Sequence, residues 1–183
     1  MPTASEVLSA ARERPLVFRQ SSAMSRQYEL FAGERSLGAL QWPKMCSSLA
    51  EGRIGSSTWT FKRTGVWRPV VTIRTPESGD GDIARFAIGW RGGDLHLPGG
   101  RTLRWEPLTF WGAKWAFTDP ARGEQVLAFE VGHGFFKMSI EVQIDGAGPS
   151  VPATELPLLT LLGGYLLVMA AQEEAATVAV ITS

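Results

Sequence analysis

The sequence has very little of the chemistry on which most enzymes and metalloproteins depend. Its 183 residues include one cysteine, Cys46, and two histidines. A single cysteine excludes an internal disulfide, and with so few histidines it leaves too few ligands for a structural zinc site. We therefore expect a protein that holds no metal and no cofactor.

The chain also lacks an excess of charge of either sign. Eighteen Lys and Arg balance eighteen Asp and Glu, so the formal net charge is zero. This balance argues against binding nucleic acid through phosphate neutralisation. The N-terminus has no basic segment followed by an apolar run, so we expect no secretory signal. The predicted location is cytoplasmic, either free or peripheral at a membrane.

Few residues suggest catalysis or metal binding. Cys46 with His96 or His133 would be the only nucleophile and base, and no orienting group or oxyanion turn accompanies them. A lone cysteine is more often a small buried apolar residue. Asp80 and Asp82 resemble the start of a calcium loop but lack its later ligands. We predict no catalytic residue and no metal site, and therefore a protein that is not an enzyme.

What the sequence does contain is a series of short strand signals about ten residues apart, the spacing of sandwiches and barrels. The predicted strands are Leu16–Arg19, Gln27–Phe31, Ser36–Gln41, Leu49–Ile54, Thr58–Arg63, Val70–Thr75, Ile83–Trp90, Asp94–Leu97, Thr102–Trp105, Lys114–Thr118, Val126–Val131 and Lys137–Ile144. Alternation marks antiparallel strands with one wet and one dry face. It predicts two inward sets, which are Met138, Ile140, Val142, Ile144 and Ala84, Phe86, Ile88, Trp90.

The longest apolar run, Leu156–Ala171, carries no charge, so its helix must lie in a bilayer or be surrounded by protein. Its sixteen residues fall between a buried helix and a membrane span. Glutamates flank it, and no Lys or Arg is placed to anchor it at lipid head groups. Gly163 and Gly164 would permit close approach of surrounding walls. These details favour a buried helix over about 154–175, with a membrane span as the alternative.

Together these signals predict a mainly β protein, a closed antiparallel barrel of about twelve strands around a central hydrophobic C-terminal helix. Closure removes strand edges, and a barrel of this width leaves a lumen that a helix can fill. Residues 1–15 would form a short N-terminal helix from Thr3 to about Arg12, and residues 16–183 the barrel domain. The tail Thr177–Ser183 is β-branched, which favours pairing with the sheet or with another chain.

This layout resembles the tubby-like superfamily, which includes the LURP-one-related proteins and the phospholipid scramblases. The likeness rests on the strand order and on Tyr28–Phe31, Gly38–Trp42, Trp59–Phe61 and Lys137–Ile144 followed by Leu156–Ala171. It implies a twelve-stranded barrel threaded by a central helix. Scramblases also carry an acidic calcium-binding stretch before that helix, whereas Asp145–Glu155 has only two separated carboxylates. The small LURP-one-related proteins are therefore the nearer comparison.

Tubby domains bind phosphoinositide head groups through basic side chains, so the resemblance implies a basic surface. The candidate contacts for lipid or a partner are Lys62, Arg63, Arg68, Arg74, Arg101, Arg104 and Trp111. Alternation instead places Trp105 and Trp115 inside the barrel. The predicted function is a non-enzymatic binding module for anionic phospholipid head groups or a protein partner. The alternatives are a tail-anchored protein using Leu156–Ala171, and a small-ligand carrier or enzyme, which needs a barrel cavity that a central helix would leave closed.

Overall fold

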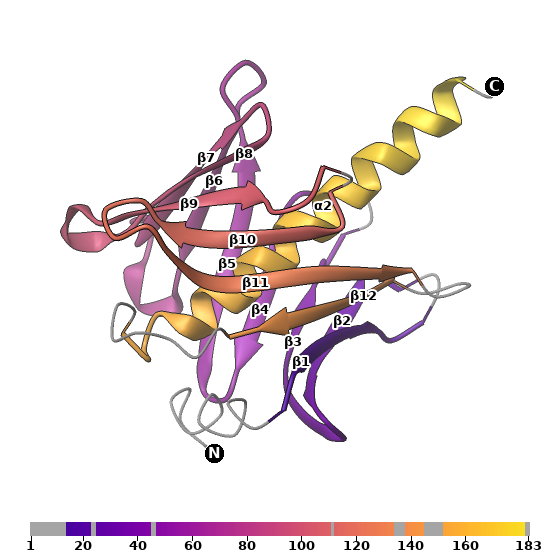
Figure 1. Cartoon of the computed structure of the whole chain (residues 1–183), viewed down its shortest axis with the longest axis horizontal. Coiled ribbons are helices and arrows are strands. Elements are labelled where there is room, and N and C mark those ends of the chain that lie inside the picture. Colours follow the sequence, from indigo (N-terminus) through magenta and orange to yellow (C-terminus); the bar gives the residue numbers. More distant parts are fainter. Residues whose placement is uncertain are drawn as a thin grey trace.

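Twelve antiparallel strands follow one another round a closed barrel, and one long helix occupies its interior in this computed structural model (Figure 1). The structure describes residues 14–22, 25–44, 47–110, 112–133, 138–144 and 152–181. The predicted helix from Thr3 to Arg12 lies outside these residues. The predicted fold class, a mainly β closed barrel around a C-terminal helix, is confirmed.

Each observed strand overlaps one predicted strand. They are β1 (Leu16–Gln20), β2 (Gln27–Ala32), β3 (Arg35–Gln41), β4 (Ala50–Ile54), β5 (Ser57–Thr64), β6 (Val70–Arg74), β7 (Ala84–Gly89), β8 (Gly92–His96), β9 (Thr102–Pro107), β10 (Lys114–Asp119), β11 (Glu124–His133) and β12 (Met138–Gln143). Every strand pairs with its neighbours in the chain, and β1 pairs with β12, with Leu16 opposite Val142. This last pairing closes the sheet and removes its edges.

Side-chain alternation decides which residues face the interior. In β12, Ile140 and Val142 are buried whereas Gln143 is exposed, as predicted. The prediction fails at one end of β7. Trp90 was expected on the inner face, but β7 ends at Gly89 and Trp90 lies in the hairpin turn, where it is 98% exposed. Side chains alternate between the two faces only within a strand, so the inward pattern does not extend to this residue.

The helix α2 (Leu156–Ile181) runs through the barrel, and its last turns project beyond the strands (Figure 1). The run from Leu158 to Tyr165 is buried, as predicted. The helix continues past the predicted limit near residue 175 to Ile181, so the prediction of a strand from residue 177 is wrong. The closed sheet leaves no edge for the tail to pair with, and an existing helix extends at little cost.

Three glycines set how closely α2 lies against the wall. A Cβ at Gly163 would meet the Phe129 ring at 2.2 Å, and one at Gly164 would meet the Phe18 ring at 3.0 Å. In β4, a Cβ at Gly52 would be 3.0 Å from Leu161. The predicted close approach at Gly163 and Gly164 is confirmed. The helix packs most closely on β3, β4, β5 and β11, away from the wall formed by β6 to β9.

By length and composition, the segment Leu156–Val178 of α2 is also long and apolar enough to cross a membrane. Its most apolar window has a mean hydropathy of 1.4, and 67% of that window is buried inside the barrel. The same apolar character therefore serves to fill the barrel in this structure. The tail-anchor alternative would need the segment to lie outside the strands.

Candidate functional site

The two ends of the barrel differ in their chemistry, and the up-and-down strand order decides which connections lie at each. The connections after β1, β3, β5, β7, β9 and β11 lie at the end where α2 leaves the barrel, which we call the exit end. The connections after β2, β4, β6, β8 and β10 lie at the opposite end, where α2 begins. Each end therefore gathers residues from the whole length of the chain.

Large exposed apolar side chains gather at the exit end. Among the described residues, all of them lie in its connections or on the projecting part of α2, and they are Leu49, Val66, Trp67, Trp90, Leu108, Phe110 and Val178. Trp67 is 96% exposed and Trp90 is 98% exposed. Water-exposed apolar surface of this kind is rarely left without a use, and it marks interaction sites.

The aromatic connections form one surface rather than separate loops. The backbone N–H of Ile88 in β7 donates to the carbonyl of Pro69, at 3.0 Å, which holds the β5–β6 and β7–β8 connections together. The Arg91 guanidinium lies over the Phe110 ring, 5.8 Å from its centre, and joins the β7–β8 connection to the β9–β10 connection. Trp67, Trp90 and Phe110 thus belong to neighbouring connections of the exit end.

Basic residues accompany these aromatic side chains. Lys44, Arg68 and Arg91 are exposed in the exit-end connections, and the sequences of those connections contain no Asp or Glu. Arg26 also lies there, stacked over the Trp42 ring at 5.3 Å and bonded to the Gln172 side chain of α2 at 2.5 Å. The acidic residues near this end include Glu173 and Glu174 on the helix, Glu51 at the start of β4 and Glu106 near the end of β9.

The opposite end is rich in carboxylates. Glu34, Glu77 and Asp80 are exposed there, and Asp82 binds the guanidinium groups of Arg74 and Arg85 at 2.8 and 2.9 Å. The hydrogen bond from Arg74 is the main cause that lowers the pKa of Asp82. Because its carboxylate already holds these two arginines, this loop is an ion-paired hairpin. Arginines accompany these carboxylates, among them Arg101 and Arg122, so this end carries charges of both signs.

The structure divides the basic residues predicted from the sequence between the two ends. Lys62 and Arg63 close β5 near the exit end, and Arg68 lies in the connection that follows. Arg101 lies at the opposite end, bonded to Glu155 at 2.9 Å and to Asp119 at 3.2 Å. Arg74 is the last residue of β6 at that same end.

Arg104 lies on β9, separated from β5 by β6, β7 and β8, and pairs with Asp94 at 3.3 Å. The seven predicted residues therefore do not form one patch. Trp111 lies outside the described residues. Arg68 is the predicted residue that the structure combines with the aromatic surface of the exit end, because it is exposed directly after Trp67.

The exposed Trp67 and Trp90 were missed as candidate contacts. A signal for them exists in the sequence, because aromatic residues recur in alternate turns, at Trp42, Trp67 and Phe110, and Trp90 directly precedes another of these turns. Trp105 and Trp115 do face inward, as predicted, with their rings stacked 5.4 Å apart. His96 is exposed on β8, with its Nδ1 3.2 Å from the Thr102 hydroxyl.

The remaining chemical candidates show no assembled centre among the described residues. Cys46 and the side chain of His133 lie outside them, and His133 is the last residue of β11. Within the described ranges, no group of three or more His, Cys, Asp and Glu side chains is placed to hold a metal ion.

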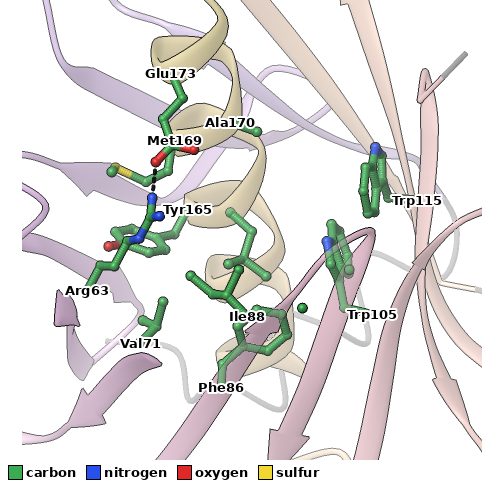
Figure 2. A pocket seen from close by; sticks show the side chains of 13 residues that line it. Arg63, Val71, Phe86, Ile88, Trp105, Trp115, Tyr165, Met169, Ala170 and Glu173 are labelled. Carbon is green, nitrogen blue, oxygen red and sulfur yellow. Dashed lines mark hydrogen bonds and ion pairs between the residues drawn. The ribbon is translucent and has the colours of Figure 1, made fainter. Parts of the chain in front are cut away.

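A cavity of about 140 Å³ lies beside α2 just below the exit end (Figure 2). The helix leans away from β6 to β9, and this displacement leaves the space. Apolar side chains of Phe86, Ile88, Trp105 and Trp115 form its outer wall, as Figure 2 shows. The sequence-based expectation that a central helix would leave no cavity is therefore wrong at this end.

A polar latch fixes α2 beside the cavity. The Tyr165 hydroxyl donates to the carbonyl of Ser48 at 2.7 Å, and burial raises the pKa of Tyr165 to about 12. About two turns further along the helix, Glu173 pairs with Arg63 of β5 (Figure 2). These contacts hold the exit half of the helix to the β3–β4 connection and to β5, beside the cavity that Tyr165, Arg63 and Glu173 also line.

Comparisons of the chain with protein-family models, with curated proteins and with solved structures found no match.

Proposed function

We propose that the protein is a non-enzymatic binding module that docks on an anionic membrane surface through the exit end of its barrel. The observation that carries the proposal is the coincidence of three features at one end. These are the exposed tryptophans Trp67 and Trp90, the acid-free basic connections, and the projecting helix. Among the described residues, the opposite end has no large exposed apolar side chain, which favours the same orientation.

Amphipathic aromatic rings suit the boundary between lipid head groups and acyl chains. Trp67 and Trp90 are almost completely exposed at the tips of hairpins, where they can enter that boundary without unfolding any strand. Apolar insertion alone gives weak attachment, and a second signal is needed for stable binding. The basic side chains beside the tryptophans supply that second signal.

The electrostatic contribution can be gauged from the exposed cations. Lys44, Arg68 and Arg91 lie in the connections that would face the membrane. Each Lys or Arg near an anionic leaflet contributes roughly 1 kcal/mol, so these three contribute about 3 kcal/mol. Glu173 reduces this electrostatic attraction only weakly, because its charge is already paired with Arg63. A protein partner would have to offer a large acidic and apolar surface to match the same end.

The barrel closed by twelve strands around an apolar C-terminal helix supports the resemblance to the tubby-like superfamily. We extend the proposal to that kinship, with the LURP-one-related proteins as its nearer branch. The membrane-facing surface proposed here differs from the basic patch expected from the sequence, since it uses the ends of hairpins and includes Arg68 but neither Arg74 nor Arg101.

Vesicle flotation of the full chain tests the proposal. We expect binding to vesicles that combine phosphatidylcholine with phosphatidylserine, and much weaker binding to phosphatidylcholine alone. Arg68→Glu removes one attraction and adds one repulsion, about 2 kcal/mol in total, which predicts roughly thirty-fold weaker binding. Arg122→Glu, an exposed position at the opposite end, is the matched control and should bind as the unchanged protein does.

Replacement of both Trp67 and Trp90 by serine should also abolish flotation without loss of the folded barrel, which circular dichroism would check. The proposal is wrong if the unchanged protein binds none of the anionic vesicles. It is equally wrong if Arg122→Glu weakens binding as much as Arg68→Glu, because the charge would then act without regard to the end on which it lies.

A further inference from the structure

The cavity beside α2 differs from an ordinary packing defect in its place and its lining. It lies between the exit half of the helix and the strands from β6 to β10. It reaches the exit end at Gly89 and Gly92, which flank the hairpin turn that carries Trp90. On the helix it is bordered by Ala170, which is exposed, so the cavity is accessible from the proposed membrane side.

The deeper lining is apolar. Phe86, Ile88, Trp105, Trp115 and Met169 surround the space, and the two tryptophans lie one above the other along one side (Figure 2). At about 140 Å³ the cavity matches the size of engineered apolar cavities near 150 Å³, which stay dry and bind benzene. The volume and the apolar lining therefore suit a ring or a short length of alkyl chain.

The charged groups that line the cavity are Arg63 and Glu173, which pair across its mouth (Figure 2). The Glu173 side chain is 56% exposed, whereas that of Arg63 is 30% exposed. Glu173 can therefore turn into water at little cost, because the solvent replaces its hydrogen bonds. Arg63 would then present its guanidinium at the mouth, and a planar guanidinium binds carboxylates and phosphates through paired hydrogen bonds.

From this arrangement we propose that the cavity binds the apolar chain of an anionic amphiphile, whose carboxylate or phosphate takes the place of Glu173 on Arg63. The chain occupies the space between α2 and the two stacked tryptophans, and the head group stays at the exit end. The inference rests on the proposed function in one respect, since a docked membrane is the natural supply of such a molecule. Either a free fatty acid or an anionic phospholipid has the required chemistry.

The exchange keeps Arg63 paired and adds one negative charge at the mouth, on the hydrated Glu173. The ligand anion replaces one carboxylate on Arg63, so the guanidinium stays paired throughout, and Glu173 gains full hydration. An uncharged amphiphile of the same length would have to leave the existing ion pair in place. The geometry therefore predicts a preference for acids over alcohols, in addition to a preference for chains that reach the tryptophans.

Quenching of tryptophan fluorescence by a brominated chain tests this proposal in solution, with no vesicles present. The probe is 11-bromoundecanoic acid, and the matching neutral probe is 11-bromoundecanol. We expect saturable quenching by the acid, at least ten-fold tighter than by the alcohol. Arg63→Met should remove the preference for the acid, and Arg63→Lys should restore part of it because the positive charge returns.

A second pair of variants locates the bound chain. Ala170→Phe places a ring in the cavity from an exposed helix position, so it fills the space without removing a core contact. It should abolish saturable quenching. Ala175→Phe, on the exposed part of the same helix and away from the cavity, is the matched control and should leave quenching unchanged. Thermal unfolding of both variants verifies that the barrel is intact.

The two sources of the ligand are separated by a second probe, a soluble short-chain phosphatidylserine added in competition with the bromo acid. Displacement by it assigns the cavity to phospholipid, and retention of the bromo acid assigns it to free fatty acid. The proposal is overturned if quenching does not saturate, if Ala170→Phe leaves it unchanged, or if acid and alcohol bind alike. Flotation of Ala170→Phe on anionic vesicles distinguishes this failure from failure of membrane docking, which uses other residues.

Discussion

Gly163 offers the sharpest test of how the helix fits the barrel. An alanine Cβ at this position would lie 2.2 Å from Phe129 Cζ and 2.5 Å from its Cε1. Ordinary contacts between carbon atoms are longer than 3.4 Å. The ring must therefore move by more than 1 Å, or the helix must shift along the barrel. Neither movement is easy, because Phe129 is 1% exposed and packs on Trp105 and Phe117.

The size of the effect follows from two opposing contributions. Overpacking of a core by one methyl costs about 1–3 kcal/mol, and a clash as deep as this one belongs at the upper end. Replacement of glycine by alanine within a helix returns about 1 kcal/mol. We therefore expect Gly163→Ala to lower the free energy of unfolding by about 2 kcal/mol. Equilibrium unfolding in urea, followed by tryptophan fluorescence, measures this difference.

The adjacent glycine is the matched control. A Cβ at Gly164 would lie 3.0 Å from Phe18 Cε2, so the ring has to give way by only a few tenths of an ångström. The gain in helix propensity then offsets most of the cost, and Gly164→Ala should lie within about 1 kcal/mol of the unchanged protein. The double variant Gly163→Ala with Phe129→Leu should lose less stability than the sum of the losses of the two single variants, because the smaller side chain relieves the clash.

The account of the helix is wrong if Gly163→Ala is as stable as the unchanged protein, or if Gly164→Ala is the more damaging of the two. Either result would mean that Phe129 does not press on the helix at this point. The position of Trp105, which packs on Phe129 and lines the cavity, would then need another explanation as well.

Three further predictions concern single polar groups. The pKa of Tyr165 is about 12 in the folded protein and about 10 when unfolded. The free energy of unfolding should therefore keep its full value below pH 10 and fall by about 1.4 kcal/mol per pH unit between pH 10 and 12. Tyr165→Phe should remove this slope, which urea unfolding at each pH measures. The hydroxyl of Thr160 is buried without a hydrogen-bond partner, so Thr160→Val should raise the melting temperature, with a gain of about 1 kcal/mol. The Asp82 carboxylate, whose pKa is lowered in the folded protein, stabilises the fold above pH 3.8, and this contribution is lost as the pH falls through the folded pKa. Asp82→Asn should therefore reduce the dependence of the free energy of unfolding on pH in that range.

The strands could be predicted from the sequence because their signals are local. Alternation of apolar residues, as at Ile140 and Val142, depends only on which face of a strand meets the core. The apolar helix was equally evident, since Leu156–Ala171 has no polar face to expose. Closure of the sheet and the central position of the helix followed from the need to cover both the strand edges and the apolar surface of the helix.

The candidate site could be predicted only in small part, because it depends on which turns meet in space. Arg68 was identified, whereas Arg74 and Arg101 were grouped with it although they lie at the other end. Trp90 was assigned to a strand because one more alternating residue looks the same in sequence whether or not the strand has ended. The end of a strand is set by pairing with its neighbour, here Gly89 opposite Gly92.

The cavity could not have been predicted, since it results from the lateral position of the helix in the barrel. That position depends on contacts at Gly52, Gly163 and Gly164 with particular side chains of the wall. The sequence indicates that glycine allows close approach, but it does not indicate the direction in which the helix is displaced. Only the assembled packing shows that the displacement is away from β6 to β9.

The most direct test of the central claim is the immersion depth of spin labels on a protein bound to anionic vesicles, measured by electron paramagnetic resonance with oxygen as the relaxing agent. Labels are placed at Val66, in an exit-end connection, and at Arg122, in a connection at the opposite end, each after Cys46→Ser. We predict that the label at position 66 lies within the acyl-chain boundary and that the label at position 122 remains in water. Equal exposure of both labels to water, or immersion of position 122, would contradict the proposed orientation.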